Sequence, residues 1–283
     1  LVWMCFSLSA QKIIDLSGKW SFSIDRQDNG EKEKWFSHTL NDFINLPGSM
    51  PEKLKGDEVT AKTQWTGSLY DSSYYYNPYM EKYRKEGNIK FPFFLTPDKH
   101  YVGAAWYQKE VNIPADWKGE RILLFLERPH IETTVWVNGQ KTGMQNSLCV
   151  PHQYDITRYV RPGKCTITIR VDNRIKEINV GPDSHSITDQ TQGNWNGIVG
   201  RICLQTTPKT YFDDIQIYPE PEQKLARVKV VIKGTGTAKV KLSAESFNTD
   251  KKHIVPAIQQ EIKLNKGVTE TEMVLPMGND MLL

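Results

Sequence analysis

The pentapeptide VWVNG, residues 135–139, decides the fold class. Its first three residues are β-branched or aromatic, and such residues are enriched in strands. Asn138 and Gly139 follow at once, and this dipeptide tolerates the positive φ angles of a two-residue type I′ turn. The pentapeptide therefore predicts a strand that ends in a tight β-hairpin. Upstream, residues 122–126 (ILLFL) are continuously apolar, which is typical of a strand covered on both faces.

Alternating patterns predict further strands on both sides of this hairpin. Over residues 166–171 every second side chain is apolar. This period of two predicts one face in a core and one face in water, the latter carrying Thr168 and Arg170. Residues 16–25 alternate in the same way. Many short strands separated by Gly, Pro and Asn turns indicate an all-β sandwich, and a helix is predicted only over residues 77–85.

A domain boundary is predicted near Thr207-Pro208, because the sequence before it is rich in Trp and Tyr, whereas the sequence after it has no Trp and contains Lys-rich alternating strands. We therefore expect one domain over residues 11–207 and a second over residues 208–283. The second segment is short for an immunoglobulin-like sandwich of ~100 residues. It ends in the apolar run Met281-Leu282-Leu283, so we expect it to be truncated, with more of the domain following in a parent protein.

The composition argues against several classes of protein. The net charge is only +3 and no basic tract is present, which disfavours a nucleic-acid partner. No stretch after the N-terminus approaches the ~20 apolar residues of a membrane span. Neither CxxC nor HExxH spacing occurs, and no phosphate-binding or dinucleotide-binding glycine pattern is present. We therefore predict no metal and no cofactor.

Residues 1–10, LVWMCFSLSA, are apolar and uncharged and end in small residues. They are typical of the end of a secretory signal peptide cut after Ala10, which predicts a secreted or periplasmic protein. The alternative is a buried first strand. Loss of Cys5 with the signal would leave three cysteines, and an odd number argues against a fully paired disulfide framework.

Two segments could carry chemistry. Residues 64–94 form a long insertion rich in Tyr, Phe and Trp, which either binds a sugar ring or packs on its own domain. Residues 180–201 place carboxylate, amide and indole groups in one loop, which is either a saccharide subsite or a well-capped turn. The predicted substrate-binding residues of this loop are Asp189, Gln192, Asn194, Trp195 and Asn196.

The sequence predicts no catalytic residue in this chain. Glycoside hydrolysis generally uses two carboxyl groups ~5–9 Å apart across a cleft. Asp213 and Asp214 are adjacent, so on a strand they would point to opposite faces. Asp183 and Asp189 share a loop, but nothing around them in the sequence indicates a raised pKa.

Several segments together resemble the sugar-binding domain of glycoside hydrolase family 2, the family of β-galactosidases and β-glucuronidases. They are WYQKEVNIP (106–114), ERPHIETTVWVNGQKTG (127–143), CVPHQYDIT (149–157) and TDQTQGNWNGIVGRICL (188–204). The opening LSGKWSFSID and the run LPGSM also fit the start of that family. The resemblance covers nearly the whole chain after Ala10.

The resemblance implies a jelly-roll sandwich over residues 11–207, followed by an immunoglobulin-like sandwich and then a (β/α)8 barrel with both catalytic glutamates. This chain contains neither an Asn-Glu dipeptide nor an alternating βα pattern, so we expect the barrel to lie outside it. The resemblance also implies that the loop before the Asn196-Gly197-Ile198 run lends polar groups to the sugar subsite, with Asp189 as the candidate acid. Members of the family tend to carry this Asp closer to the Gly, where this chain has Thr191.

We therefore expect the chain to be the non-catalytic front part of a retaining β-glycosidase of the β-galactosidase type. Its partners would be a glycoside or oligosaccharide substrate and its own barrel. A stand-alone lectin-like module and a purely structural adhesion sandwich are the alternatives. The sequence gives no indication of the number of subunits.

Overall fold

The structure, a computed structural model, describes residues 12–67, 71–91, 96–176, 184–185, 187–189, 193–245 and 253–278. The predicted signal peptide, residues 1–10, and the predicted site residue Gln192 lie outside these ranges. The chain divides into two compact units, Leu1–Thr206 and Thr207–Leu283. The secretory signal and the predicted types of the two domains stay predictions.

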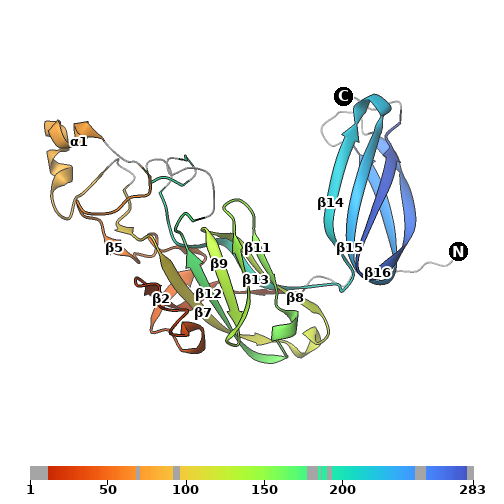
Figure 1. The fold of residues 1–283 in the computed structure, drawn as a ribbon, viewed down its shortest axis with the longest axis horizontal. Helices are drawn as coiled ribbons and strands as arrows, with labels where there is room; N and C mark the ends of the chain where they lie inside the picture. Colours follow the sequence, from red (N-terminus) through yellow and green to blue (C-terminus); the bar gives the residue numbers. More distant parts are fainter. Residues whose placement is uncertain are drawn as a thin grey trace. The chain divides into compact units, whose positions relative to one another are not determined.

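Two antiparallel sheets form most of the first unit (Figure 1). The six-stranded sheet has the order β10 (Gln140–Asn146), β9 (Glu132–Val137), β12 (Gly163–Asp172), β7 (Ala104–Ile113), β2 (Gly18–Asp25) and β3 (Asp42–Leu46). The five-stranded sheet has the order β1 (Ile13–Asp15), β13 (Gly197–Thr207), β8 (Arg121–Pro129) and β11 (His152–Asp155), and β4 (Gly48–Ser49) also pairs with β13.

Short elements connect these strands. The pair β5 (Asp57–Glu58) and β6 (Lys99–His100) encloses the aromatic insertion, which contains α1 (Ser72–Tyr76) and the 3-10 turn η2 (Pro78–Arg84). The other 3-10 turns described in the first unit are η1 (Trp35–Ser37), η3 (Ala115–Trp117) and η4 (Thr157–Tyr159). The helix predicted over residues 77–85 is therefore wrong in type: Asn77 caps a 3-10 turn, and the α-helical turn precedes it.

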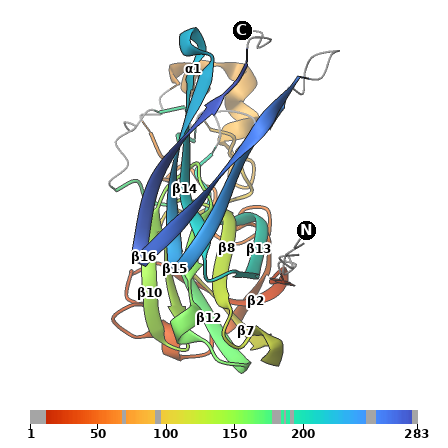
Figure 2. The same ribbon diagram turned by 90° about the vertical axis from the view of Figure 1, so that its right-hand side faces the viewer.

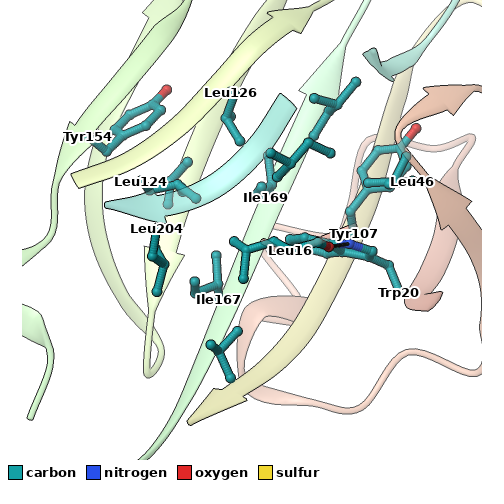
Figure 3. Packing of buried hydrophobic residues seen from close by; sticks show 14 of the residues in the cluster. Leu16, Trp20, Leu46, Tyr107, Leu124, Leu126, Tyr154, Ile167, Ile169 and Leu204 are labelled. Atoms are coloured by element: carbon teal, nitrogen blue, oxygen red, sulfur yellow. Dashed lines mark hydrogen bonds between the residues drawn. The ribbon is translucent and has the colours of Figure 1, made fainter. Parts of the chain in front are cut away.

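The main core lies between the two sheets of the first unit. Figure 3 shows Leu124, Leu126 and Leu204 of the five-stranded sheet facing Ile167 and Ile169 of the six-stranded sheet. All five side chains are fully buried. Each buried Leu or Ile side chain contributes roughly 1.5–3 kcal/mol through removal of its apolar surface from water. The predicted all-β sandwich is confirmed.

The hairpin prediction is also confirmed. Asn138 and Gly139 have φ angles of 50° and 77°, and they join β9 to β10 with Val137 opposite Gln140. These positive φ values are those of a type I′ turn, whose twist matches that of the paired strands.

The outer face of the six-stranded sheet carries a second, aromatic cluster. Trp106 stacks on Trp136 at 5.0 Å, and Phe36 of η1 stacks on Trp136 at 5.2 Å. The Gln108 amide donates to Thr168 Oγ1 (3.1 Å) and to the carbonyl of His38 (3.0 Å). The prediction that Thr168 and Arg170 face water is therefore wrong, because the segment around η1 covers this face.

The second unit is a single antiparallel sheet of three long strands, β14 (Tyr211–Glu220), β15 (Leu225–Glu245) and β16 (Ile254–Pro276), with the turn η5 (Pro221–Gln223) (Figure 2). Bulges interrupt the β15–β16 register near Gly234 and Leu242. A small core forms around Val230, Val240 and Leu264. Within the described residues of both units, no helix is long and apolar enough to cross a membrane.

Candidate functional site

The loop that leads into β13 holds four of the five predicted site residues. Asp189, Asn194 and Asn196 are buried, and the Trp195 side chain is half-buried. The fifth residue, Gln192, lies outside the described residues. The loop therefore brings polar groups together, but it turns most of them into the protein.

Asp189 is the centre of this arrangement, with only 1% of its surface exposed. Its Oδ1 accepts a hydrogen bond from the Asn194 backbone N–H (2.6 Å), and its Oδ2 accepts one from the Thr66 backbone N–H (2.7 Å). His100 Nε2 lies 3.2 Å from Oδ2. The backbone N–H of Asp189 donates back to the Thr66 carbonyl (3.1 Å).

These partners explain how a carboxylate can stay buried at this position. A buried charge is costly unless it is paired and hydrogen-bonded, and here two backbone N–H groups and an imidazole serve Asp189. Thr66 lies near the start of the aromatic insertion, and His100 follows its end. Asp189 therefore fastens both ends of the insertion to the loop before β13, and its predicted contact with sugar stays a prediction.

Asn194 extends the same network. Its Nδ2 donates to Thr66 Oγ1 (2.9 Å) and to the carbonyl of Asn173 (3.0 Å), which uses both amide hydrogens. Its Oδ1 is buried and has no hydrogen-bond partner within the described part of the chain. Asn194 thus positions the insertion and retains one unused acceptor.

Both polar groups of the Asn196 side-chain amide have hydrogen-bond partners within the protein. Its Oδ1 accepts from the Tyr107 hydroxyl (2.7 Å), and its Nδ2 donates to the carbonyls of Gly103 and Val171 (2.9 Å each). These bonds fix the start of β13 against β7 and β12. The amide has no hydrogen left for a ligand in this conformation.

Trp195 stacks on His130, with ring centroids 4.6 Å apart and an interplanar angle of 20°. Burial lowers the pKa of His130 to about 4, against the opposite influence of the neighbouring Asn194 side chain and the Asp189 charge. The imidazole is therefore neutral at pH 7. Its Nε2 is buried without a hydrogen-bond partner among the described residues, as is Asn194 Oδ1.

An ion cluster supports the strand ends next to this loop. Asp172 is fully buried, and its Oδ2 lies 2.6–3.0 Å from the cationic groups of Arg170, Arg174 and Lys176. Burial alone would raise the pKa of Asp172, but hydrogen bonds from Arg174 and Lys176 and the charge of Arg170 hold it well below its usual value. Removing one partner from such a cluster is strongly destabilising, because it leaves an unpaired buried charge.

The described residues hold no group of three or more His, Cys, Asp or Glu side chains that could bind a metal ion. The described residues of the loop before β13 are hydrogen-bonded to the sandwich and to the aromatic insertion.

Residues 13–208 match the family model described as "Glycosyl hydrolases family 2, sugar binding domain". The chain belongs to glycosyl hydrolases family 2. The family resemblance inferred from the segments over 106–204 is therefore confirmed.

Curated relatives of this family 2 chain include several β-glucuronidases. The chain is 24% identical to human β-glucuronidase over 266 residues, covering 84% of this chain and 35% of that protein. It is 25% identical to the β-glucuronidase of Paenibacillus borealis over 222 residues, covering 73% of this chain and 31% of that protein. The chain thus spans about a third of the length of these relatives.

Solved structures of family 2 proteins share the fold. A β-glucuronidase from Ruminococcus gnavus in complex with D-glucuronic acid aligns with a TM-score of 0.59 at 17% identity, covering 95% of this chain and 40% of that one. An uncultured Clostridium sp. β-glucuronidase aligns with a TM-score of 0.57 at 21% identity, covering 96% of this chain and 40% of that one.

Sequence reasoning missed the partners that organise this family 2 loop. His100 and Thr66 lie 89 and 123 residues from Asp189 along the chain, and His130 lies 64 residues before Asn194. No spacing rule links positions so far apart. The one available signal is that His100 follows the aromatic insertion in which Thr66 also lies.

Proposed function

We propose that this chain is the non-catalytic front part of a retaining β-glycosidase of family 2, and that its first unit helps to shape the substrate subsite. The observation that carries the proposal is the family match over residues 13–208, in a chain that spans about a third of the length of its β-glucuronidase relatives. We place the two catalytic glutamates in a (β/α)8 barrel of the parent protein, outside these 283 residues. We also propose that the parent protein is secreted or periplasmic.

For the substrate, we propose a terminal β-linked glucuronic acid. The β-galactosidase type expected from the sequence stays a prediction, whereas the relatives reported above are all named β-glucuronidases. The hydrogen bonds that Asp189 makes with Thr66 and Asn194 support a positioning role, since sugar subsites need side chains held in place by their neighbours.

The test uses the complete parent protein and two aryl β-glycosides, p-nitrophenyl β-glucuronide and p-nitrophenyl β-galactoside. We expect a kcat/KM at least tenfold higher for the glucuronide. A preference for the galactoside would refute the glucuronide assignment, and no hydrolysis of any aryl β-glycoside would refute the proposed enzyme.

A further inference from the structure

A pocket of about 290 Å³ lies between the segment after β5 and the aromatic insertion. We propose that this pocket binds a pyranose ring of a neutral β-linked glycan. Four aromatic side chains line the pocket, together with hydroxyl and amide groups. The lining residues are Thr60, Ala61, Thr63, Gln64, Trp65, Tyr74, Tyr75, Ile89 and Phe91.

The aromatic walls are held in fixed positions. Tyr74 is buried and packs on Phe91 at 4.7 Å and edge-on against Tyr75 at 5.2 Å. Trp65 is held edge-on by His100 at 4.7 Å, and His100 in turn contacts Asp189. The network around Asp189 therefore fixes one wall of the pocket.

The helical part of the insertion is fastened as well. The Tyr74 hydroxyl donates to the Tyr83 carbonyl (2.7 Å), and the Arg84 guanidinium donates to the Tyr74 carbonyl. Asp71 caps α1 by accepting from the Ser73 N–H (2.9 Å). Because this wall is ordered before binding, the protein loses less conformational entropy when a ligand binds.

Part of this aromatic surface remains open. Tyr75 lines the pocket with 52% of its surface exposed, and Trp65 is only half-buried. A pyranose ring with equatorial hydroxyls presents flat C–H faces, which pack well on an exposed aromatic ring. Ala61 and Ile89 are the only aliphatic residues that line the pocket besides these rings.

The polar lining suits sugar hydroxyls. Thr63 Oγ1 accepts from the Thr60 N–H (2.9 Å), and Thr60 Oγ1 accepts from the Lys62 N–H (3.2 Å). Each threonine hydroxyl therefore keeps its own hydrogen to donate. The exposed Gln64 amide offers a carbonyl oxygen as acceptor beside them. Ligand pockets commonly combine such apolar walls with a few polar groups.

A second pocket of about 460 Å³ shares Thr60, Thr63 and Gln64 with the first. Of its charged lining residues, Arg26 pairs with Asp57, and Glu58 pairs with Lys99, which does not itself line the pocket. The two pockets thus adjoin across one segment, so that a chain of more than one sugar residue could extend from the aromatic pocket into the polar one.

The probe is cellotetraose, whose β-linked glucose units have all hydroxyls equatorial, titrated calorimetrically into the 283-residue chain. We expect saturable binding that weakens at least about tenfold in Tyr75→Ala and in Trp65→Ala, a change of about 1.4 kcal/mol. Trp65→Phe, which keeps a ring, should retain most of the affinity. Tyr79→Ala is the matched control, because Tyr79 is 84% exposed and does not line the pocket.

Circular dichroism and thermal unfolding of each variant separate loss of binding from loss of fold. Because Trp65 supports His100, the Tyr75 variant decides the outcome if Trp65→Ala unfolds. No saturable binding by the wild-type chain, or equal weakening in Tyr79→Ala, would overturn the proposal. Hydrolysis of aryl β-glycosides by the parent protein is a separate measurement. If this chain binds cellotetraose but the parent protein hydrolyses no aryl β-glycoside, only the proposed enzyme is refuted.

Discussion

Asp189 shows how one side chain can organise a site without being exposed. Its carboxylate accepts hydrogen bonds from the Thr66 and Asn194 backbones and contacts His100, three groups from separate stretches of chain. Hydrogen bonds to a charged group contribute more to stability than bonds between neutral groups, and a buried donor without an acceptor destabilises the fold. The stability of the loop and of the insertion should therefore depend on this one charge.

We expect Asp189→Asn to lower the free energy of unfolding by about 1–3 kcal/mol. The carboxylate accepts hydrogen bonds with both of its oxygens, whereas the amide has only one oxygen, so one buried donor loses its acceptor. Urea unfolding followed by circular dichroism measures this. The matched control is Asp98→Asn, which changes an exposed acid two residues before His100 and should leave the midpoint unchanged. Equal stability of the two variants would contradict the role given to Asp189.

His130 makes stability depend on pH. Its folded-state pKa of about 4 lies below the usual 6.5, so the unfolded chain binds the extra proton between these two values. The stabilisation is complete above pH 6.5 and is lost as the pH falls through 4. In urea unfolding between pH 7.5 and 4, His130→Phe, which keeps a ring against Trp195, should show a shallower pH dependence by about one proton. Identical slopes for variant and wild type would reject this account.

At the scale of elements, β13 depends on close approach of the backbone. Gly197 has a φ of 146°, and a Cβ at this position would lie 2.5 Å from the Gly48 carbonyl oxygen, across the β13–β4 pairing. Because the obstacle is backbone, it cannot move aside as a flexible side chain could. The same pairing region carries Asn196, so this glycine also fixes the start of the site loop.

Gly197→Ala should therefore destabilise the protein by about 1–3 kcal/mol more than Gly163→Ala. Gly163 has a positive φ of 108° but nothing within 4 Å of the added carbon, so that variant has the backbone strain without the clash. Thermal unfolding of both variants makes the comparison. A Gly163 variant as unstable as the Gly197 variant would show that strain alone, and not the contact with β4, sets the cost.

The strands were predictable because their signal is local. The alternation over 166–171 and the Asn138-Gly139 turn are set by neighbouring residues, and both elements form as expected. The burial of Thr168 was not predictable, because the segment that covers it lies more than a hundred residues earlier. For the same reason the polar content of the site loop could be predicted, whereas the partners of Asp189 could not.

At the scale of the whole molecule, the first unit has the parts of a sugar-binding sandwich of family 2. The family match over residues 13–208 covers almost all of its described residues, and buried polar contacts join its loop to the insertion. The three-stranded second unit follows from Thr207 onward. The proposed bond-breaking acids belong to neither unit.

The most direct test of this central claim is prolonged incubation of the 283-residue chain with p-nitrophenyl β-glucuronide and p-nitrophenyl β-galactoside. The account predicts no p-nitrophenol above the rate of a buffer blank. Release of p-nitrophenol that disappears when one Asp or Glu of this chain is replaced by its amide would contradict it.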